Sequence, residues 1–252
     1  YLESVAPLKY QAEYDNSGLI VGNENDEVTG ALITLDCTEE VVEEAIKVGT
    51  NLIIAHHPIV FSGLKKLNGS NYVERTVLKA IENKIAIYAI HTNLDAVPNG
   101  VNSKIGSLLG LKNLQILSPD SRFPEVGAGM IGELSIPMGF DAFIGHLKTS
   151  MKLPVIRHTR ALDHKISRVA FCGGSGSFLI EAALSTEADV FISSDIKYHE
   201  FFDADNQMVI IDAGHYEMEV ATKDLIYEIL SEKFRTFTLH FSEIITNPIN
   251  YL

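Results

Sequence analysis

The stretch "ALITLDCTEEVVEEAIKVGTNLIIAHHPI", residues 31–59, sets out a strand, a helix and a second strand. Its first five residues are an apolar run typical of a buried strand, and the apolar residues of 39–48 share one face of a helix. The second apolar run, 52–55, leads directly into the doublet His56–His57. Continuous apolar strands joined by an amphipathic helix indicate a parallel α/β sheet.

The same alternation continues outward from this stretch. After a helix within 72–83 and a strand at 85–90, a second series follows: a strand at 168–172, a helix at 177–188, a strand at 189–193, a short helix at 196–204, a strand at 207–213, a helix at 217–234 and a closing strand at 236–241. Between the two series, 127–137 suggests a strand and 140–151 a helix. The prediction is an α/β chain of two halves, 1–120 and 121–252, with mixed, mostly parallel sheets flanked by helices.

The two halves correspond residue by residue around their histidines. "IYAIHTNLD" (87–95) aligns without a gap with "IDAGHYEME" (211–219), which sets His91 opposite His215 and Asp95 opposite Glu219. With one residue inserted, the preceding helix and strand set His57 opposite Asp195. This correspondence predicts an internal duplication. The alternative is a chance likeness between two units of the same strand–helix rhythm.

Charge and cysteine content narrow the functional classes. The formal net charge is −13, and the 20 Lys and Arg residues are scattered, so nucleic-acid binding is disfavoured. The two cysteines, Cys37 and Cys172, are far apart and form no disulfide framework, as in a reducing, cytoplasmic setting. No apolar run approaches the ~20 residues of a membrane helix, and the first ten residues do not resemble a secretory signal, so no membrane partner is expected.

Three polar clusters follow predicted strands, where parallel α/β sheets bind ligands. They are the doublet His56–His57, the run from His91 to Asp95, and the run from His215 to Glu219. Because side chains alternate along a strand, the two rings of the doublet are expected to diverge and to serve two different metals. His215 and Glu219 are four residues apart and share one face of a helical turn.

Imidazole and carboxylate donors without thiolate suit Zn, Mn, Fe, Co or Ni better than Ca or Mg. Five protein ligands are too many for one catalytic zinc, but they suit two divalent ions per chain sharing a carboxylate. The alternative is that histidines at strand ends are merely hydrogen-bonded polar residues. That alternative is favoured for the isolated histidines His146, His158, His164 and His240, whereas burying the doublet requires two sets of partners.

A ligand assignment follows from reach and rigidity. Glu219 is predicted to bridge both ions, since its side chain is longer than that of Asp95 and it is expected on the first turn of a long helix, whereas Asp95 is expected on a loop. His215 is expected to share one ion with His56, and Asp95 to share the other with His57. His91 and His199 are candidates for substrate binding, with a structural role as the alternative. The run "CGGSGS", 172–177, is either an anion-binding turn or a tight strand-to-helix turn.

Seven segments in order along nearly the whole chain resemble the NIF-three-like family, also called dinuclear metal centre proteins or GTP cyclohydrolase 1 type 2 homologues. The segments are "YDNSGLIVGN", "IIAHHPIVF", "IYAIHTNLDAVPNGVN", "VAFCGGSGS", "ISSDIKYHE", "IDAGHYEMEV" and "TNPINYL". The resemblance implies two similar, intertwined α/β halves and a toroidal homohexamer. It also implies a two-metal site at His56, His57, Asp95, His215 and Glu219. Residues 120–165 are too few for the additional domain of some members, so the chain resembles the short form.

Two functional hypotheses follow. The first is a two-metal hydrolase, in which activated water attacks a phosphate ester or a ring carbon of a small phosphorylated or purine-like ligand; the cyclohydrolase reaction enters only through the family name. The second is a non-catalytic ring that handles metal or acts as a scaffold for partners. Open coordination positions for water would favour the enzyme, whereas a site closed by protein ligands would favour the second.

Overall fold

The strand, helix and strand predicted for 31–59 form as β2 (Gly30–Thr34), α2 (Glu39–Val48) and β3 (Leu52–Ala55) in the computed structural model, which describes residues 1–252. The Thr38 side chain caps α2 by accepting the Val41 N–H at 3.4 Å. The helix ends at Gly49, whose φ of 78° is left-handed and costs a glycine little. Local sequence signals therefore determine both ends of this helix.

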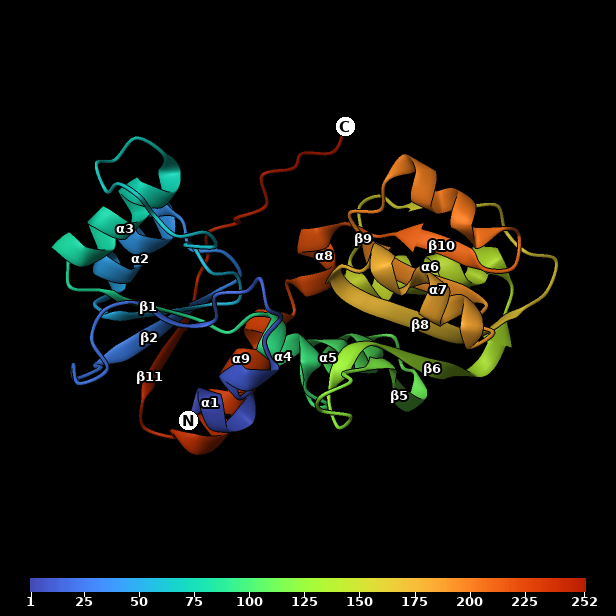
Figure 1. The fold of residues 1–252 in the computed structure, drawn as a ribbon, viewed down its shortest axis with the longest axis horizontal. Coiled ribbons are helices and arrows are strands. Elements are labelled where there is room, and N and C mark those ends of the chain that lie inside the picture. The colour runs from blue at the N-terminus through green and yellow to red at the C-terminus, as the bar shows by residue number, and fades with distance from the viewer. The chain divides into compact units, whose positions relative to one another are not determined.

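The first sheet has the strand order β1-β4-β3-β2-β11. Its remaining strands are β1 (Gly18–Val21), β4 (Ala86–Ala89) and β11 (Thr238–Phe241). All neighbours are parallel except β1, which is antiparallel to β4. Figure 1 shows α2 and α3 (Tyr72–Glu82) over one face of this sheet and α9 (Thr222–Lys233) over the other. The N-terminal segment adds α1 (Leu2–Val5) and a 3-10 turn, η1 (Leu8–Tyr10).

The second sheet has the order β5-β6-β8-β9-β10-β7. Its strands are β5 (Lys112–Pro119), β6 (Gly127–Met138), β7 (Arg157–His158), β8 (Ile166–Ser175), β9 (Val190–Ser194) and β10 (Val209–Asp212). The strands β8, β9 and β10 are parallel, and the other neighbours are antiparallel. The accompanying helices are α5 (Val101–Leu108), α6 (Phe140–Met151), η2 (Ser177–Leu179), α7 (Ile180–Ser185), η3 (Tyr198–Ala204) and α8 (His215–Glu219).

The predicted internal duplication is present in the topology. Each sheet contains three adjacent parallel strands in chain order, β2-β3-β4 and β8-β9-β10, and an antiparallel edge strand beside the third. His91 follows β4 and His215 follows β10, so the two histidines occupy equivalent places. His91 directly precedes the five-residue helix α4 (Thr92–Ala96), and His215 is the first residue of the five-residue helix α8. The sequence did not indicate β1, β5 or β7, and of these β1 and β7 are the equivalent edge strands.

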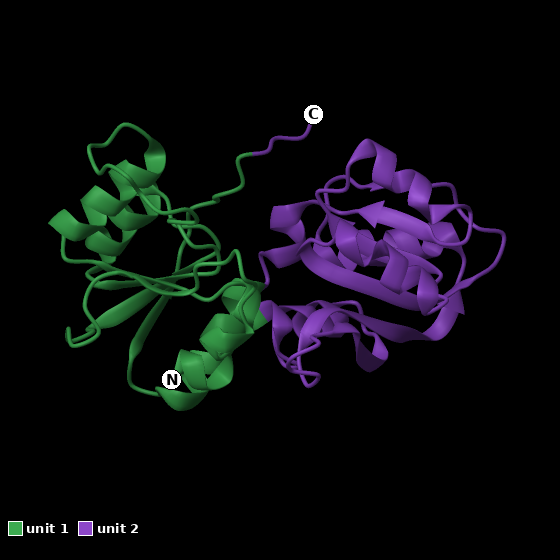
Figure 2. Ribbon diagram, in the orientation of Figure 1, with its two compact units in different colours: residues 1–94, 222–248 green, residues 95–221, 249–252 purple.

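Contacts divide the chain into two compact units, coloured separately in Figure 2. Unit 1 contains Tyr1–Leu94 and Thr222–Pro248, and unit 2 contains Asp95–Ala221 and Ile249–Leu252. These bounds differ from the predicted halves 1–120 and 121–252. The reason is that α5 and β5 pack in the second unit, whereas α9 and β11 return to the first. The chain thus enters each unit twice, as intertwined halves require.

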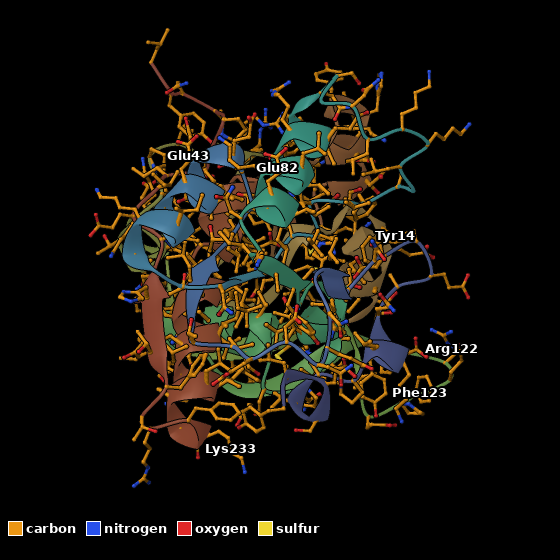
Figure 3. The ribbon with its side chains drawn as sticks, turned by 90° about the vertical axis from the view of Figure 1, so that its left-hand side faces the viewer. Tyr14, Glu43, Glu82, Arg122, Phe123 and Lys233 are labelled. Carbon is orange, nitrogen blue, oxygen red and sulfur yellow. The ribbon has the colours of Figure 1, made fainter.

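Charged side chains lie on the outer side of the helical layer of unit 1. Lys79 of α3 pairs with Glu43 of α2, and Arg75 pairs with Glu39 at 2.9 Å. Figure 3 shows Glu43 and Glu82 on these two helices, both exposed. None of the helices in the structure is both long and apolar enough to cross a membrane.

Candidate metal centre

In unit 1, the chain brings three imidazoles together beyond the ends of two neighbouring strands. His56 and His57 follow β3, and His91 follows β4. Their ring centroids lie 4.9, 5.2 and 5.3 Å apart. One nitrogen from each ring lies within 4.8 Å of the other two. His56 is fully buried, and the other two are half-buried. These three residues are called the imidazole cluster.

Each ring of the imidazole cluster is oriented through Nδ1. Nδ1 of His56 donates to the Ile90 carbonyl at 2.8 Å. Nδ1 of His57 lies 2.7 Å from the Asp36 carboxylate, and Nδ1 of His91 lies 2.7 Å from Asp15. Carbonyl and ionised carboxylate oxygens only accept hydrogen bonds, so each Nδ1 carries the proton and a neutral ring keeps its lone pair on Nε2. Metal-binding histidines typically have this arrangement.

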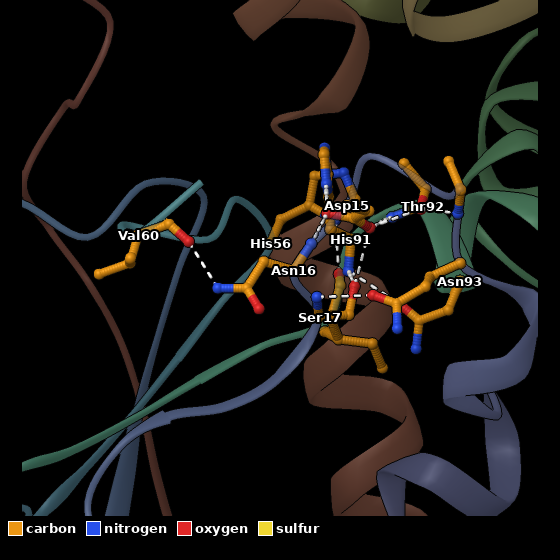
Figure 4. Close-up of polar contacts among 11 residues, drawn as sticks. Asp15, Asn16, Ser17, His56, Val60, His91, Thr92 and Asn93 are labelled. Carbon is orange, nitrogen blue, oxygen red and sulfur yellow. Dashed lines mark hydrogen bonds and ion pairs between the residues drawn. The ribbon is translucent and has the colours of Figure 1, made fainter. Parts of the chain in front are cut away.

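The Asp15 carboxylate is itself held by several donors, which Figure 4 shows. It accepts the Thr92 backbone N–H at 3.1 Å and the Ser17 hydroxyl at 2.9 Å. Burial raises the pKa of Asp15, but the hydrogen bond and charge of His91, with the bonds from Thr92 and Asn16, outweigh burial and hold it well below its usual range. Asp15 is therefore a fixed, ionised acceptor for His91.

The two rings of the doublet do not point to opposite sides of the chain, as strand alternation predicted. Their centroids are 4.9 Å apart and their planes are tilted by 46°. The reason is that β3 ends at Ala55, so the alternation of a regular strand does not continue through the doublet.

In unit 2, His215 and Glu219 are the first and last residues of α8. Nε2 of His215 lies 3.0 Å from Oε2 of Glu219, so the predicted sharing of one helical face is confirmed. Nδ1 of His215 lies 2.7 Å from the carboxylate of Asp195, which follows β9. Glu219 is only 2% exposed.

The glycine-rich run 172–177 makes room for Glu219. Gly174 has a φ of 62°, and a Cβ built on it would lie 2.3 Å from Oε1 of Glu219. Most of the run belongs to β8, and only the 3-10 turn η2 and the six-residue α7 follow it. The close approach of α8 to β8 thus explains Gly174 without an anion.

Asp95 lies on α4 and belongs to unit 2. The buried Asn102 side chain donates to the Asp95 carbonyl at 3.1 Å and accepts the Gly173 N–H at 3.0 Å, which links Asp95 to β8. Burial raises the pKa of the Cys172 thiol, and the charges of Asp95 and Glu219 raise it further. Carboxylate oxygens of Asp95 and Glu219 lie within 4.8 Å of each other, and Glu219 contacts the end of β8 at Gly173 and Gly174.

The other histidines lie elsewhere. His199 is exposed on η3, with ring contacts to Tyr198 and Phe202, and no candidate metal group contains it. The predicted structural role fits three further histidines, whose rings are hydrogen-bonded to Leu109, Thr159 and Asp189: His146, His158 and His164.

Sequence reasoning missed the residues that orient the histidines. Asp36 follows β2 and Asp195 follows β9, so both lie beyond the carboxyl end of a parallel strand, which is the signal in the sequence that could have identified them. Asp15 gave no such signal, since it reaches His91 from the segment before β1. The donor set fits a divalent ion, because imidazoles whose Nδ1 is engaged and carboxylates are ligands of borderline metals.

Comparison with known proteins gives one consistent family. The model of the family described as Duf34/NIF3 (NGG1p interacting factor 3) matches residues 1–248. A Lactococcus lactis protein named GTP cyclohydrolase 1 type 2 homolog is 36% identical over 98% of this chain and 95% of its own length. A Staphylococcus epidermidis protein of the same name is 28% identical over 99% of this chain and 97% of its own.

Two solved structures share the fold over the whole chain. A hypothetical protein of Staphylococcus aureus has a TM-score of 0.91 and 31% identity, with 96% of its chain covered. A Bacillus cereus protein related to NIF3 has a TM-score of 0.90 and 27% identity, with 97% of its chain covered. The match along the length of the chain shows that this protein belongs to the DUF34/NIF3 family.

Proposed function

We propose that the chain binds two divalent ions through His56, His57, Asp95, His215 and Glu219 and acts as a metal-dependent hydrolase. The imidazole cluster is the observation that carries the proposal. The proposed ligands within it are His56 and His57, which offer nitrogens within 4.8 Å of each other on rings held through Nδ1 and so form a preorganised pair of donors. A purely structural role does not require two adjacent rings to be oriented in this way.

The carboxylates of unit 2 support a pair of ions rather than one. Two dications close together repel strongly, and a shared carboxylate reduces that repulsion. Glu219 is the proposed bridge, because it is buried and held on α8. Asp95 is the proposed ligand of one ion. His91 remains the proposed substrate-binding residue, with its ring 5.3 Å from that of His57.

When bound, a pair of divalent ions makes water a better nucleophile near neutral pH and stabilises negative charge that develops on the substrate. The residues of this chain keep the donors in place: Asp15, Asp36 and the Ile90 carbonyl hold three rings, and Asp195 holds His215. The proposed substrate is a small phosphorylated or purine-like molecule, attacked at a phosphate ester or a ring carbon. The name of the relatives, GTP cyclohydrolase 1 type 2 homolog, supports the purine as a candidate.

The test is hydrolysis by metal-loaded protein of GTP and of simple phosphate esters, with wild type and Glu219→Gln compared under the same metal. We expect turnover by wild type that requires metal and is abolished by Glu219→Gln. Metal binding without turnover of either class would overturn the hydrolase and favour the second candidate.

The second candidate is a non-catalytic ring that handles metal or acts as a scaffold. The donor set supports this candidate too, because oriented imidazoles hold an ion whether or not a substrate binds. In either case we propose a cytoplasmic setting, where the buried thiols of Cys37 and Cys172 stay reduced.

A further inference from the structure

His215 and Asp195 lie on two turns that leave neighbouring parallel strands. Asp195 follows β9 with a φ of 56°, and Gly214 follows β10 with a φ of 90°. The hydrogen bond between His215 Nδ1 and the Asp195 carboxylate forms only if the distance between these two turns is fixed. At the end of the two strands, the N–H of Ala213, just after β10, donates to the carbonyl of Ser193 in β9 at 2.8 Å.

A single buried carboxylate, Asp212, spans the two turns. Its Oδ1 accepts the Gly214 N–H at 3.1 Å, next to His215. Its Oδ2 accepts the Ile196 N–H at 3.1 Å, next to Asp195. Asp212 is 7% exposed, so these bonds are largely shielded from water. One rigid side chain thus fixes the spacing between the turn that carries the metal-binding histidine and the turn that carries its partner.

Arg157 completes this link. Its guanidinium contacts Oδ2 of Asp212 and also donates to the Ile196 carbonyl at 3.0 Å. It comes from β7, whose two residues pair with β10 so that Arg157 lies opposite Asp212. A buried carboxylate is costly unless a cation accompanies it, and Arg157 supplies that cation. The equivalent edge strand of unit 1, β1, is preceded by Asp15 and Ser17, which hold His91.

We infer that Asp212, with Arg157, is a positioning residue for the metal centre. It holds Asp195 on Nδ1 of His215, so that His215 presents Nε2 toward Glu219 and the ion. The edge strand beside each third strand serves the same purpose in both halves of the duplication. This inference rests on the proposed metal binding, and the partners of metal ligands typically change affinity about 10–100-fold when they are mutated.

The test compares Asp212→Asn with the control Asp189→Asn. An amide offers one acceptor where the carboxylate offers two, so Asp212→Asn cannot satisfy both Gly214 and Ile196. Asp189 is a matched control at the opposite end of β9: it accepts the N–H groups of Ser167 and Arg168 of β8 at 2.7 and 2.8 Å and pairs with His164. Both variants should lower the Tm of the metal-free protein.

The distinguishing readout is Co²⁺ affinity by calorimetry. We expect Asp212→Asn to weaken binding about tenfold or more and Asp189→Asn to leave it within about twofold. Equal affinities in the two variants, or equal losses, would overturn the inference. If Asp212→Asn fails to fold, Arg157→Gln takes its place, because it keeps the Asp212 carboxylate and changes a side chain that is 60% exposed. It should weaken Co²⁺ binding by more than Asp189→Asn does and by less than is expected of Asp212→Asn.

A crystal structure of the metal-free Asp212→Asn variant separates this inference from the proposed function. We expect the distance from His215 Nδ1 to Asp195 to exceed the roughly 3.5 Å limit of a hydrogen bond. An unchanged distance would overturn the positioning role even where metal binds. Wild type that binds no Co²⁺ would overturn the proposed function, whatever the geometry of the variant.

Discussion

At each histidine of the proposed site, the partner of Nδ1 decides which nitrogen can bind an ion. The partners are an oxygen in every case: the Ile90 carbonyl or a carboxylate of Asp15, Asp36 or Asp195. Three of the four partners lie on or next to a loop that follows a strand, so the sheets that carry the ligands also carry the residues that orient them. The donor chemistry could be predicted from the sequence, whereas these pairings depend on which strands are neighbours.

The bridging role of Glu219 gives a prediction about its replacement. Glu219→Gln should weaken the binding of both ions, because a neutral amide no longer reduces the repulsion between them, whereas Asp95→Asn should weaken mainly one. Calorimetric titration of each variant measures this, with Glu232→Gln, exposed on α9, as the control. The bridge is wrong if Glu219→Gln still binds one ion at wild-type affinity.

Cys37 gives a prediction for alkaline pH. Burial, and then the charge of Asp36, raise the pKa of its thiol from 9.0 to about 12. The unfolded chain therefore loses this proton first, and the contribution of the thiol to stability falls as the pH rises from about 9 to about 12. In urea unfolding across this range, Cys37→Ala should show a weaker loss of stability than wild type. Parallel pH profiles would contradict the assignment.

At the scale of elements, α8 can lie against β8 only because position 174 has no side chain. The α8 helix is five residues long, so packing rather than intrinsic helix stability holds it in place. Its contact with β8 also fixes where Glu219 lies. The sequence showed the glycine-rich run, but not that the run accommodates a carboxylate from a helix about 40 residues later in the chain.

Two glycine replacements test this contact. Gly174→Ala should destabilise the protein and weaken metal binding, because its Cβ would lie 2.3 Å from Oε1 of Glu219 and its φ is positive. Gly145→Ala, in α6 with open space around the new methyl group, should instead stabilise the protein by up to about 1 kcal/mol. Urea unfolding and calorimetry measure both effects. Unchanged metal affinity in Gly174→Ala would contradict the proposed contact.

At the scale of the whole molecule, the strand–helix rhythm predicted the parallel strands and the duplication, but not which unit each terminal element joins. The strand predicted at 236–241 forms as β11, yet it pairs with β2 in the first unit rather than closing the second. Nothing local in that segment specifies a partner strand near residue 30. The edge strands β1 and β7 were also missed, since four and two residues carry little periodic signal.

We propose that six copies of the chain form the toroidal homohexamer that the sequence resemblance led us to expect, and the mass of the assembly in solution tests this. Large apolar side chains such as Ile136 and Tyr198 are 74% and 71% exposed, as contacts between copies would require. Light scattering coupled to size-exclusion chromatography should give six times the mass of the chain. A monomer at micromolar concentration would contradict the ring.

The proposed metal centre is a pair of ions held by His56, His57, Asp95, His215 and Glu219. Anomalous diffraction from crystals grown with Co²⁺ or Zn²⁺ tests it most directly, because it locates each ion and its ligands. We expect two anomalous peaks roughly 3.5–4 Å apart, with Glu219 between them and one histidine of the doublet on each. A single peak at saturating metal, or peaks that do not contact the doublet, would contradict it.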